Sequence, residues 1–166
     1  MQDRSLWWQR VLVGFYVLLA FVTPISAGAA FTGTVVTVTD GDTISVMRAA
    51  TPVKVRLAGI DAPEKTQPGG LQARVFTANL VLLHTVTVTG ATTDRYGRLI
   101  GTVHFLCDGR NLSYELVRAG MAWWYRAYAP KDMTLTQLEA EARAEGRGLW
   151  AQPNPIAPWA WRKGIR

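Results

Sequence analysis

Short runs in which apolar and polar residues alternate begin at Thr34 and recur along the first two thirds of the chain. Alternation with a period of two is typical of a strand that buries one face, and these runs are rich in Val, Ile and Thr, which favour strands. Five strands are predicted, at residues 34–39, 43–47, 53–58, 85–89 and 99–107. Turn residues separate the first three, which are therefore expected to form an antiparallel meander.

A helical spacing of apolar residues follows the third strand, between about Gly70 and Leu83. Four positions fall on one face and are expected to point to the core: Leu71, Val75, Ala78 and Leu82. A second helix is predicted over residues 112–119, where Asn111 can cap the start and Gly120 can end the helix in a left-handed conformation.

A third helix is predicted over residues 133–145, with Leu135 turned inward and Glu139 turned outward. Five short strands with a helix after the third, and two more helices behind, predict an α+β fold built on a small β-barrel. The tail at 151–166 contains three prolines and is expected to run extended over the surface, pinned by its tryptophans.

The N-terminus has the pattern of an export signal. Two arginines precede an unbroken apolar run at residues 11–22, and Ala27-Gly28-Ala29 supplies small residues for cleavage. As a helix this run would rise roughly 18 Å, which is less than the ~30 Å hydrocarbon layer of a membrane. Residues 1–29 are therefore predicted to be a signal peptide cleaved near Ala29, which implies a secreted or periplasmic protein. The alternative is an uncleaved membrane anchor at residues 11–31, with the domain outside the cytoplasm.

Composition narrows the classes of partner. Lys and Arg number 18 against 12 Asp and Glu, a formal net charge of +6, and such a balance favours polyanionic partners or anionic membranes. The chain has one cysteine and two histidines, so an internal disulfide is impossible and a zinc site of a common type is not expected.

Charged residues gather around the third predicted strand. Because Val55 and Leu57 share one face, Arg56 must point away from the core. Asp61 and Glu64 follow where the strand ends, and the meander can bring Asp42 beside Asp61. Two carboxylates suit a hard cation such as calcium. The alternative is that Asp42 only bonds local backbone groups in its turn, and that Arg56 and Glu64 form an ordinary salt bridge.

A second polar cluster, TDRYGR at residues 93–98, precedes the last strand. Arg95 and Arg98 carry planar guanidinium groups that suit phosphate oxygens, and Tyr96 can stack on a base or close the loop over a substrate. The alternative is a solvated turn without a ligand.

Four motifs occur in order along the chain: DGDT at 40–43, RLAGIDAPE at 56–64, TDRYGR at 93–98 and LVRAGMAWW at 116–124. Together they resemble the staphylococcal nuclease family, over residues 34–150. The family's five-stranded OB barrel with three helices agrees with the elements predicted above. The resemblance implies a nuclease domain at residues 30–150, followed by a Pro- and Trp-rich tail similar to an extension of bacterial members.

The same resemblance implies a calcium site. The ligands carried over are the carboxylates of Asp42 and Asp61 and the backbone carbonyl of Ala62. Ala62 stands where the best-studied member has Thr, so the carbonyl contact is retained and any hydroxyl contribution is lost.

Catalytic roles carry over to three residues. Arg56 and Arg98 match the family's phosphate-binding arginines, and Glu64 matches the acidic residue that faces the attacking water. Arg95 and Tyr96 lie in the substrate-contacting loop, with Arg95 where the best-studied member has Lys. The counterpart of a later stacking tyrosine stays open among three neighbours: Tyr125, Arg126 and Tyr128.

The activity implied is that of a calcium-dependent endonuclease that hydrolyses DNA and RNA and leaves 3′-phosphate ends. Arginine and metal contacts read the backbone, so little base specificity is expected. We expect a monomer. The alternative is a non-catalytic OB module that binds nucleic acid or protein, but such a module has no chemical need for the complete set of charged residues.

Overall fold

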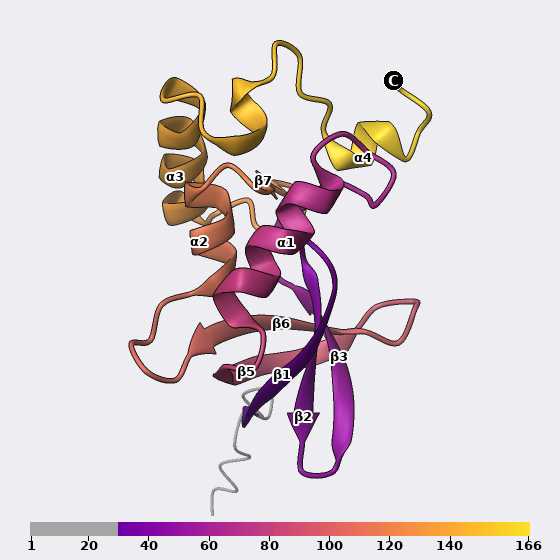
Figure 1. Ribbon diagram of the computed structural model, residues 1–166, viewed down its shortest axis with the longest axis vertical. Coiled ribbons are helices and arrows are strands. Elements are labelled where there is room, and N and C mark those ends of the chain that lie inside the picture. The colour runs from indigo at the N-terminus through magenta and orange to yellow at the C-terminus, as the bar shows by residue number, and fades with distance from the viewer. Residues whose placement is uncertain (1–29) are drawn as a thin grey trace, which may run out of the picture.

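The computed structural model describes residues 30–166, so the predicted signal segment at 1–29 lies outside the described residues. Five strands close into a barrel in the order β1-β2-β3-β6-β5. Their bounds are β1 Phe31–Asp40, β2 Thr43–Arg48, β3 Thr51–Leu57, β5 Thr85–Thr93 and β6 Leu99–Phe105. Neighbours are antiparallel except β3 and β6, whose parallel pairing closes the barrel (Figure 1). The predicted α+β OB barrel is confirmed.

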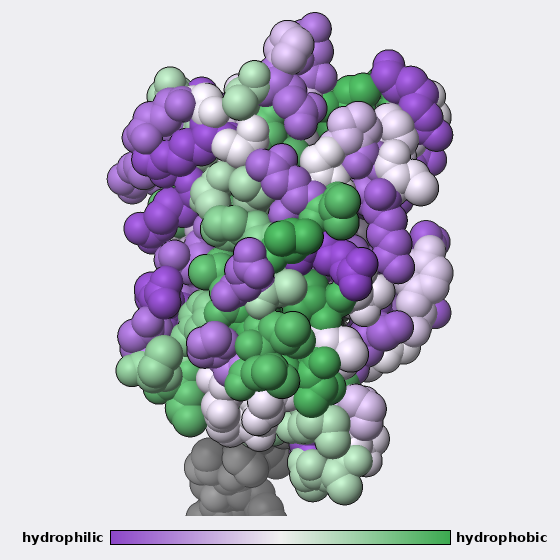
Figure 2. Space-filling model, in the orientation of Figure 1, coloured by the Kyte–Doolittle hydropathy of each residue, from purple (hydrophilic) through white to green (hydrophobic). Residues whose placement is uncertain are grey.

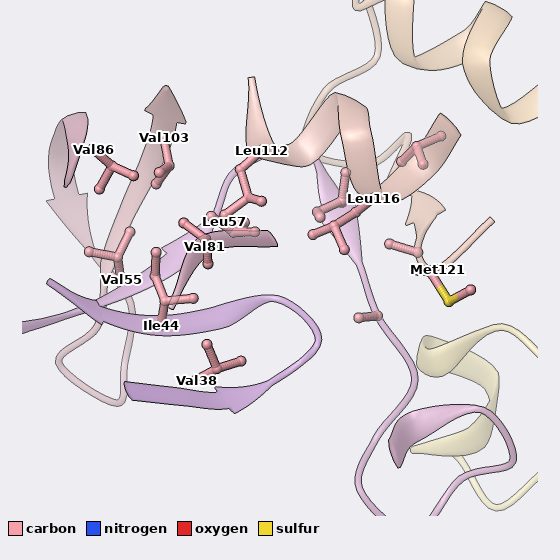
Figure 3. Packing of buried hydrophobic residues seen from close by; sticks show 14 of the residues in the cluster. Val38, Ile44, Val55, Leu57, Val81, Val86, Val103, Leu112, Leu116 and Met121 are labelled. Carbon is pink, nitrogen blue, oxygen red and sulfur yellow. The ribbon is translucent and has the colours of Figure 1, made fainter. Parts of the chain in front are cut away.

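Alternating side chains of the strands fill the barrel. Ile44 and Val46 of β2 and Val55 and Leu57 of β3 are each at most 1% exposed, and Figure 3 shows several of these residues converging. Arg56 lies between two of them and points outward, as the two-residue period requires. The core continues into the helices, and the barrel with its core lies within residues 30–166.

The first helix, α1 (Gly70–Val81), packs on the barrel through small side chains. Of the predicted inward face, Ala78 packs against the core, and the other three positions are wrong. Its buried residues are Gly70, Ala73, Thr77 and Val81. Leu71, Val75 and Leu82 are instead 68%, 48% and 39% exposed. The helix approaches the β1–β2 turn so closely that a Cβ added at Gly41 would lie 2.9 Å from the Cβ of Ala73. Larger residues cannot occupy that contact.

Val75, Ala78 and Leu82 border a groove of about 440 Å³ between α1 and β1. Figure 2 shows hydrophobic residues gathered over these two elements. The groove is lined by Val36, Thr37, Val38, Arg74, Val75, Ala78 and Leu82. None of the helices among residues 30–166 combines the length and the apolar composition needed to cross a lipid bilayer.

The helices α2 (Leu112–Arg118) and α3 (Met133–Ala144) pack against each other beside the barrel (Figure 1). The Oδ1 atom of Asn111 caps α2 by accepting from the backbone N–H of Ser113 at 2.9 Å, as expected. Gly120 follows with a φ of +69°.

Glu139 of α3, predicted to point outward, is 6% exposed, and its Oε1 accepts from the backbone N–H of Trp124 at 3.1 Å. Trp124 belongs to a two-stranded sheet of β4 (Ile60–Asp61) and β7 (Trp123–Trp124) that the sequence did not indicate. A carboxylate is tolerated in this interior because it satisfies a buried N–H.

The C-terminal tail is not extended throughout, contrary to expectation. It forms the 3₁₀ helix η1 (Gly148–Ala151) and the short helix α4 (Pro158–Trp161), which starts with proline at a position that favours it. Trp159 stacks on Tyr125 with ring centroids 5.2 Å apart, so the expected pinning by a tryptophan is present. Gln67 donates to the carbonyl of Ile156 at 2.6 Å, which fastens the tail to the loop before α1.

Candidate active site

A pair of carboxylates from different segments meets on one arginine. Asp42 lies in the turn between β1 and β2, and Asp61 lies in β4, which follows a turn at Gly59 with a φ of +77°. Arg56 of β3 bridges them, with Nη1 2.9 Å from Oδ2 of Asp42 and Nη2 2.8 Å from Oδ1 of Asp61. The structure therefore brings these three sequence-predicted residues together.

Asp42 is bonded both across the chain and to its neighbour in the sequence. Its Oδ2 accepts from the backbone N–H of Ala62 at 2.6 Å, and its Oδ1 accepts from the Thr43 hydroxyl at 3.1 Å. Asp40 is the residue that bonds locally, to the backbone N–H of Asp42. Burial raises the pKa of Asp42 to about 7, even though Arg56 and the Ala62 N–H act to lower it.

Asp61 is 1% exposed and receives a second guanidinium, from Arg162 just after α4. Nη2 of Arg162 donates to Oδ2 of Asp61 at 2.8 Å, and Nη1 donates to Oε1 of Glu64 at 2.7 Å. Burial raises the pKa of Asp61, opposed by Arg162 and Arg56. Glu64 therefore joins the cluster through Arg162 and not through the salt bridge with Arg56 that the sequence left open.

Sequence reasoning missed Arg162, because it belongs to none of the four motifs and lies about a hundred residues after its partners. Only the abundance of charged and aromatic residues in the tail pointed in its direction.

Arg56 is almost completely enclosed by protein acceptors. Its side chain is 15% exposed, and Nη1 also donates to the carbonyls of Leu57 at 3.2 Å and Ile60 at 3.1 Å. Two carbonyls and two carboxylates thus fix the guanidinium in place. Arg56 holds the site together as well as being the predicted phosphate ligand.

Arg98 reaches the carboxylates through one intervening hydroxyl. Its Nη1 donates to Oγ1 of Thr43 at 3.3 Å, and Thr43 donates in turn to Asp42. Asp94 orients Arg98 by accepting from its Nε at 2.7 Å and from its backbone N–H at 3.0 Å. The two loops that the sequence singled out are therefore adjacent at one end of the barrel.

The predicted substrate contacts lie further out. Tyr96 is 68% exposed, and the guanidinium groups of Arg95 and Arg98 lie 4.9 and 5.3 Å from the centre of its ring. Among the three candidates left open, Tyr125 is covered by Trp159, whereas Tyr128 is 74% exposed. Arg126 lies over the ring of Trp124 at 4.7 Å.

Asp42 and Asp61 are the side chains that fit a cation. Residues 30–166 contain no group of three or more His, Cys, Asp and Glu positioned to hold a metal. An ion here would depend on two carboxylates, backbone carbonyls and water, which is an oxygen set that calcium accepts and zinc disfavours. Asp42 and Asp61 are buried and lie on the same guanidinium, so their oxygens are close enough together to fit a hard divalent cation.

These residues define the structural class of the protein. It is a closed OB barrel with paired carboxylates and arginines at one end. Residues 54–152 match the family model described as staphylococcal nuclease homologue. The chain belongs to the staphylococcal nuclease family.

Curated relatives agree over most of the chain. An uncharacterised endonuclease of Escherichia coli is 46% identical over 146 residues, which cover 88% of this chain and 94% of the relative. A micrococcal nuclease of Shigella flexneri is 40% identical over 156 residues, 89% of this chain and 90% of the relative. A staphylococcal-like nuclease of Arabidopsis thaliana is 40% identical over 113 residues, 68% of this chain and 34% of that longer protein.

Proposed function

We propose that this protein is a calcium-dependent endonuclease that hydrolyses DNA and RNA with little base specificity and leaves 3′-phosphate ends. Membership of the family and nuclease relatives make it a hydrolytic nuclease that acts on nucleic acid. The observation that carries the finer proposal is the convergence of Asp42 and Asp61 on Arg56, with Glu64 and Arg98 beside them.

Asp42 and Asp61 are the proposed calcium ligands, together with the carbonyl of Ala62, whose N–H already bonds Asp42. When bound, calcium supplies a Lewis acid for a phosphate oxygen of the substrate. Arg56 and Arg98 are proposed to bind the remaining oxygens and to stabilise the charge that develops in the transition state. For this, Arg56 exchanges one of its carboxylate partners for phosphate.

Glu64 is the proposed general base. Its side chain is 40% exposed and lies beside Asp61, so a water molecule can reach it at the edge of the carboxylate cluster. A positioned base of this kind is typically worth ~10²–10⁴ in rate.

Arg95 and Tyr96 are proposed to contact the substrate beyond the cleaved bond. Their exposure and the net charge of +6 suit a flexible strand whose phosphates and base faces are bound without regard to sequence. This supports activity on both DNA and RNA.

We further propose that the domain acts outside the cytoplasm as a monomer, after cleavage near Ala29 or while tethered by residues 11–31. The apolar run in the sequence supports this proposal. Cell fractionation with N-terminal sequencing separates the two forms, and an intact domain in the cytoplasmic fraction would refute both.

The test of the activity uses residues 30–166, which contain the whole barrel and its core. Incubated with plasmid and with RNA, this protein is expected to degrade both in calcium and neither in chelator. Glu64→Gln is expected to lower the rate by about 10²–10⁴ while the fold persists. Glu141→Gln, on α3 away from the site, is the matched control and should retain the wild-type rate.

Activity in chelator would refute the proposed calcium dependence. Equal rates for wild type and Glu64→Gln would refute the proposed role of Glu64 as general base. Binding of nucleic acid without cleavage would indicate the non-catalytic OB module instead.

A further inference from the structure

The C-terminal segment, residues 155–166, brings a positive charge into contact with the carboxylates of the active site. Arg162 donates to both oxygens of Asp61, at 3.2 Å to Oδ1 and 2.8 Å to Oδ2, and to Oε1 of Glu64 at 2.7 Å. Asp61 is 1% exposed, so few directions remain from which a ligand can approach it. A guanidinium therefore lies where the proposed cation needs an oxygen ligand.

The two arginines of the cluster are held differently. Arg56 is 15% exposed and also bonds two backbone carbonyls. Arg162 is 43% exposed, and its side chain bonds the carboxylates of Asp61 and Glu64. Displacing Arg56 breaks contacts with the barrel backbone, whereas displacing Arg162 exchanges one cation for another at the solvent-facing edge. Arg162 is the guanidinium that can leave.

The segment that carries Arg162 is anchored next to the site. Trp159 stacks on Tyr125 with an interplanar angle of 9°, and Pro158 is buried. Gln67 donates to the carbonyl of Ile156 and accepts from the backbone N–H of Glu64 at 3.2 Å. These contacts keep the guanidinium at a high local concentration around the carboxylates.

We propose that Arg162 is a residue of the active site whose guanidinium competes with the divalent cation for Asp61 and Glu64. The C-terminal segment thereby sets the cation concentration at which the site fills. A divalent ion held by these carboxylates would repel a guanidinium on the same oxygens, so occupancy by one disfavours the other. The inference rests on the proposed calcium site.

The test is a calorimetric titration of calcium into residues 30–166 without nucleic acid, comparing wild type with Arg162→Gln. Losing charge-assisted hydrogen bonds that compete with the ion should lower the calcium Kd about tenfold. The calcium concentration for half-maximal nuclease activity should fall by the same factor. Lys163→Gln removes an equal charge from the next, exposed residue and should change the Kd by less than about twofold.

A second variant that ends at residue 154 lacks the whole segment and should reproduce the lower Kd, with thermal unfolding reporting whether each variant is folded. An unchanged or raised Kd in both variants, with active wild type, would overturn this inference and leave the proposed function intact. An equal decrease in Lys163→Gln would reduce the effect to net charge and would also overturn it. Absence of both calcium binding and cleavage in the wild type would overturn the proposed function, and this inference with it.

Discussion

Replacing Arg56 by Met removes the one side chain within residues 30–166 that bonds both Asp42 and Asp61. Both carboxylates are buried, at 5% and 1% exposure, so neither can turn to water. Asp61 keeps its bonds to Arg162, but Asp42 loses its guanidinium. Removing one partner of a buried ion pair typically destabilises a protein by about 3–5 kcal/mol, because the remaining charge is left uncompensated. Against a total stability of about 5–15 kcal/mol, that is a large fraction.

The loss of stability in Arg56→Met should depend on pH. Burial already raises the pKa of Asp42 to about 7, and without Arg56 its pKa should rise further. A carboxyl whose pKa is higher in the folded than in the unfolded state binds its proton more tightly when folded. Stability is therefore greatest below the unfolded value of about 4 and is lost as the pH rises through the folded value. Arg56→Met should therefore lower the free energy of unfolding more at pH 8 than at pH 5.

Urea denaturation in chelator, followed by circular dichroism at pH 5 and pH 8, measures both quantities. Arg56→Lys keeps the charge without the planar fork and should lose less at pH 8. A difference below about 1 kcal/mol between Arg56→Met and wild type at pH 8 would refute the view that Arg56 compensates these carboxylates. An equal loss at both pH values would refute the assignment of that loss to ionised Asp42 and Asp61.

Two further predictions concern the support of the site and its protons. Glu139→Leu should lower stability by about 1.5–3 kcal/mol in urea, because it leaves the Trp124 N–H without its acceptor, whereas Glu139→Gln keeps an acceptor and should lose less. The calcium Kd should fall about tenfold per pH unit up to about pH 7 and then level off, because the Asp42 proton must leave before the carboxylate can coordinate. A flat calorimetric profile between about pH 5.5 and 8 would contradict this.

Period-two patterning was sufficient to predict the barrel, because a strand with one face in a core has two choices of register and the apolar residues decide between them. The outward direction of Arg56 followed from Val55 and Leu57 on the same grounds. The pairings of β2 with β3 and of β3 with β6 then bring Asp42, Asp61 and Arg98 to one end of the barrel.

Patterning failed where contact distance or polarity, rather than hydrophobicity, determined which face was buried. On α1 the close approach to Gly41 selects Ala73 and Thr77, whose sizes carry little hydrophobic signal, so the larger apolar residues face outward. Glu139 is buried because a distant N–H needs an acceptor. Arg162 contacts Asp61 and Glu64 because the tail folds back onto the active site. The periodicity of nearby residues carries no information about that path.

The parallel pairing of β3 with β6 links catalysis to completion of folding. It aligns residues 55–57 with residues 99–101, which lie in separate parts of the chain and are joined through α1 and β5. Pairing such distant residues requires closure of the long intervening loop, which is entropically unfavourable, so it is expected late in folding. Arg56 and the segment after Arg98 become neighbours at that step, so the charged cluster is assembled only once the barrel has closed, and a chain that is still unfolded cannot cleave nucleic acid.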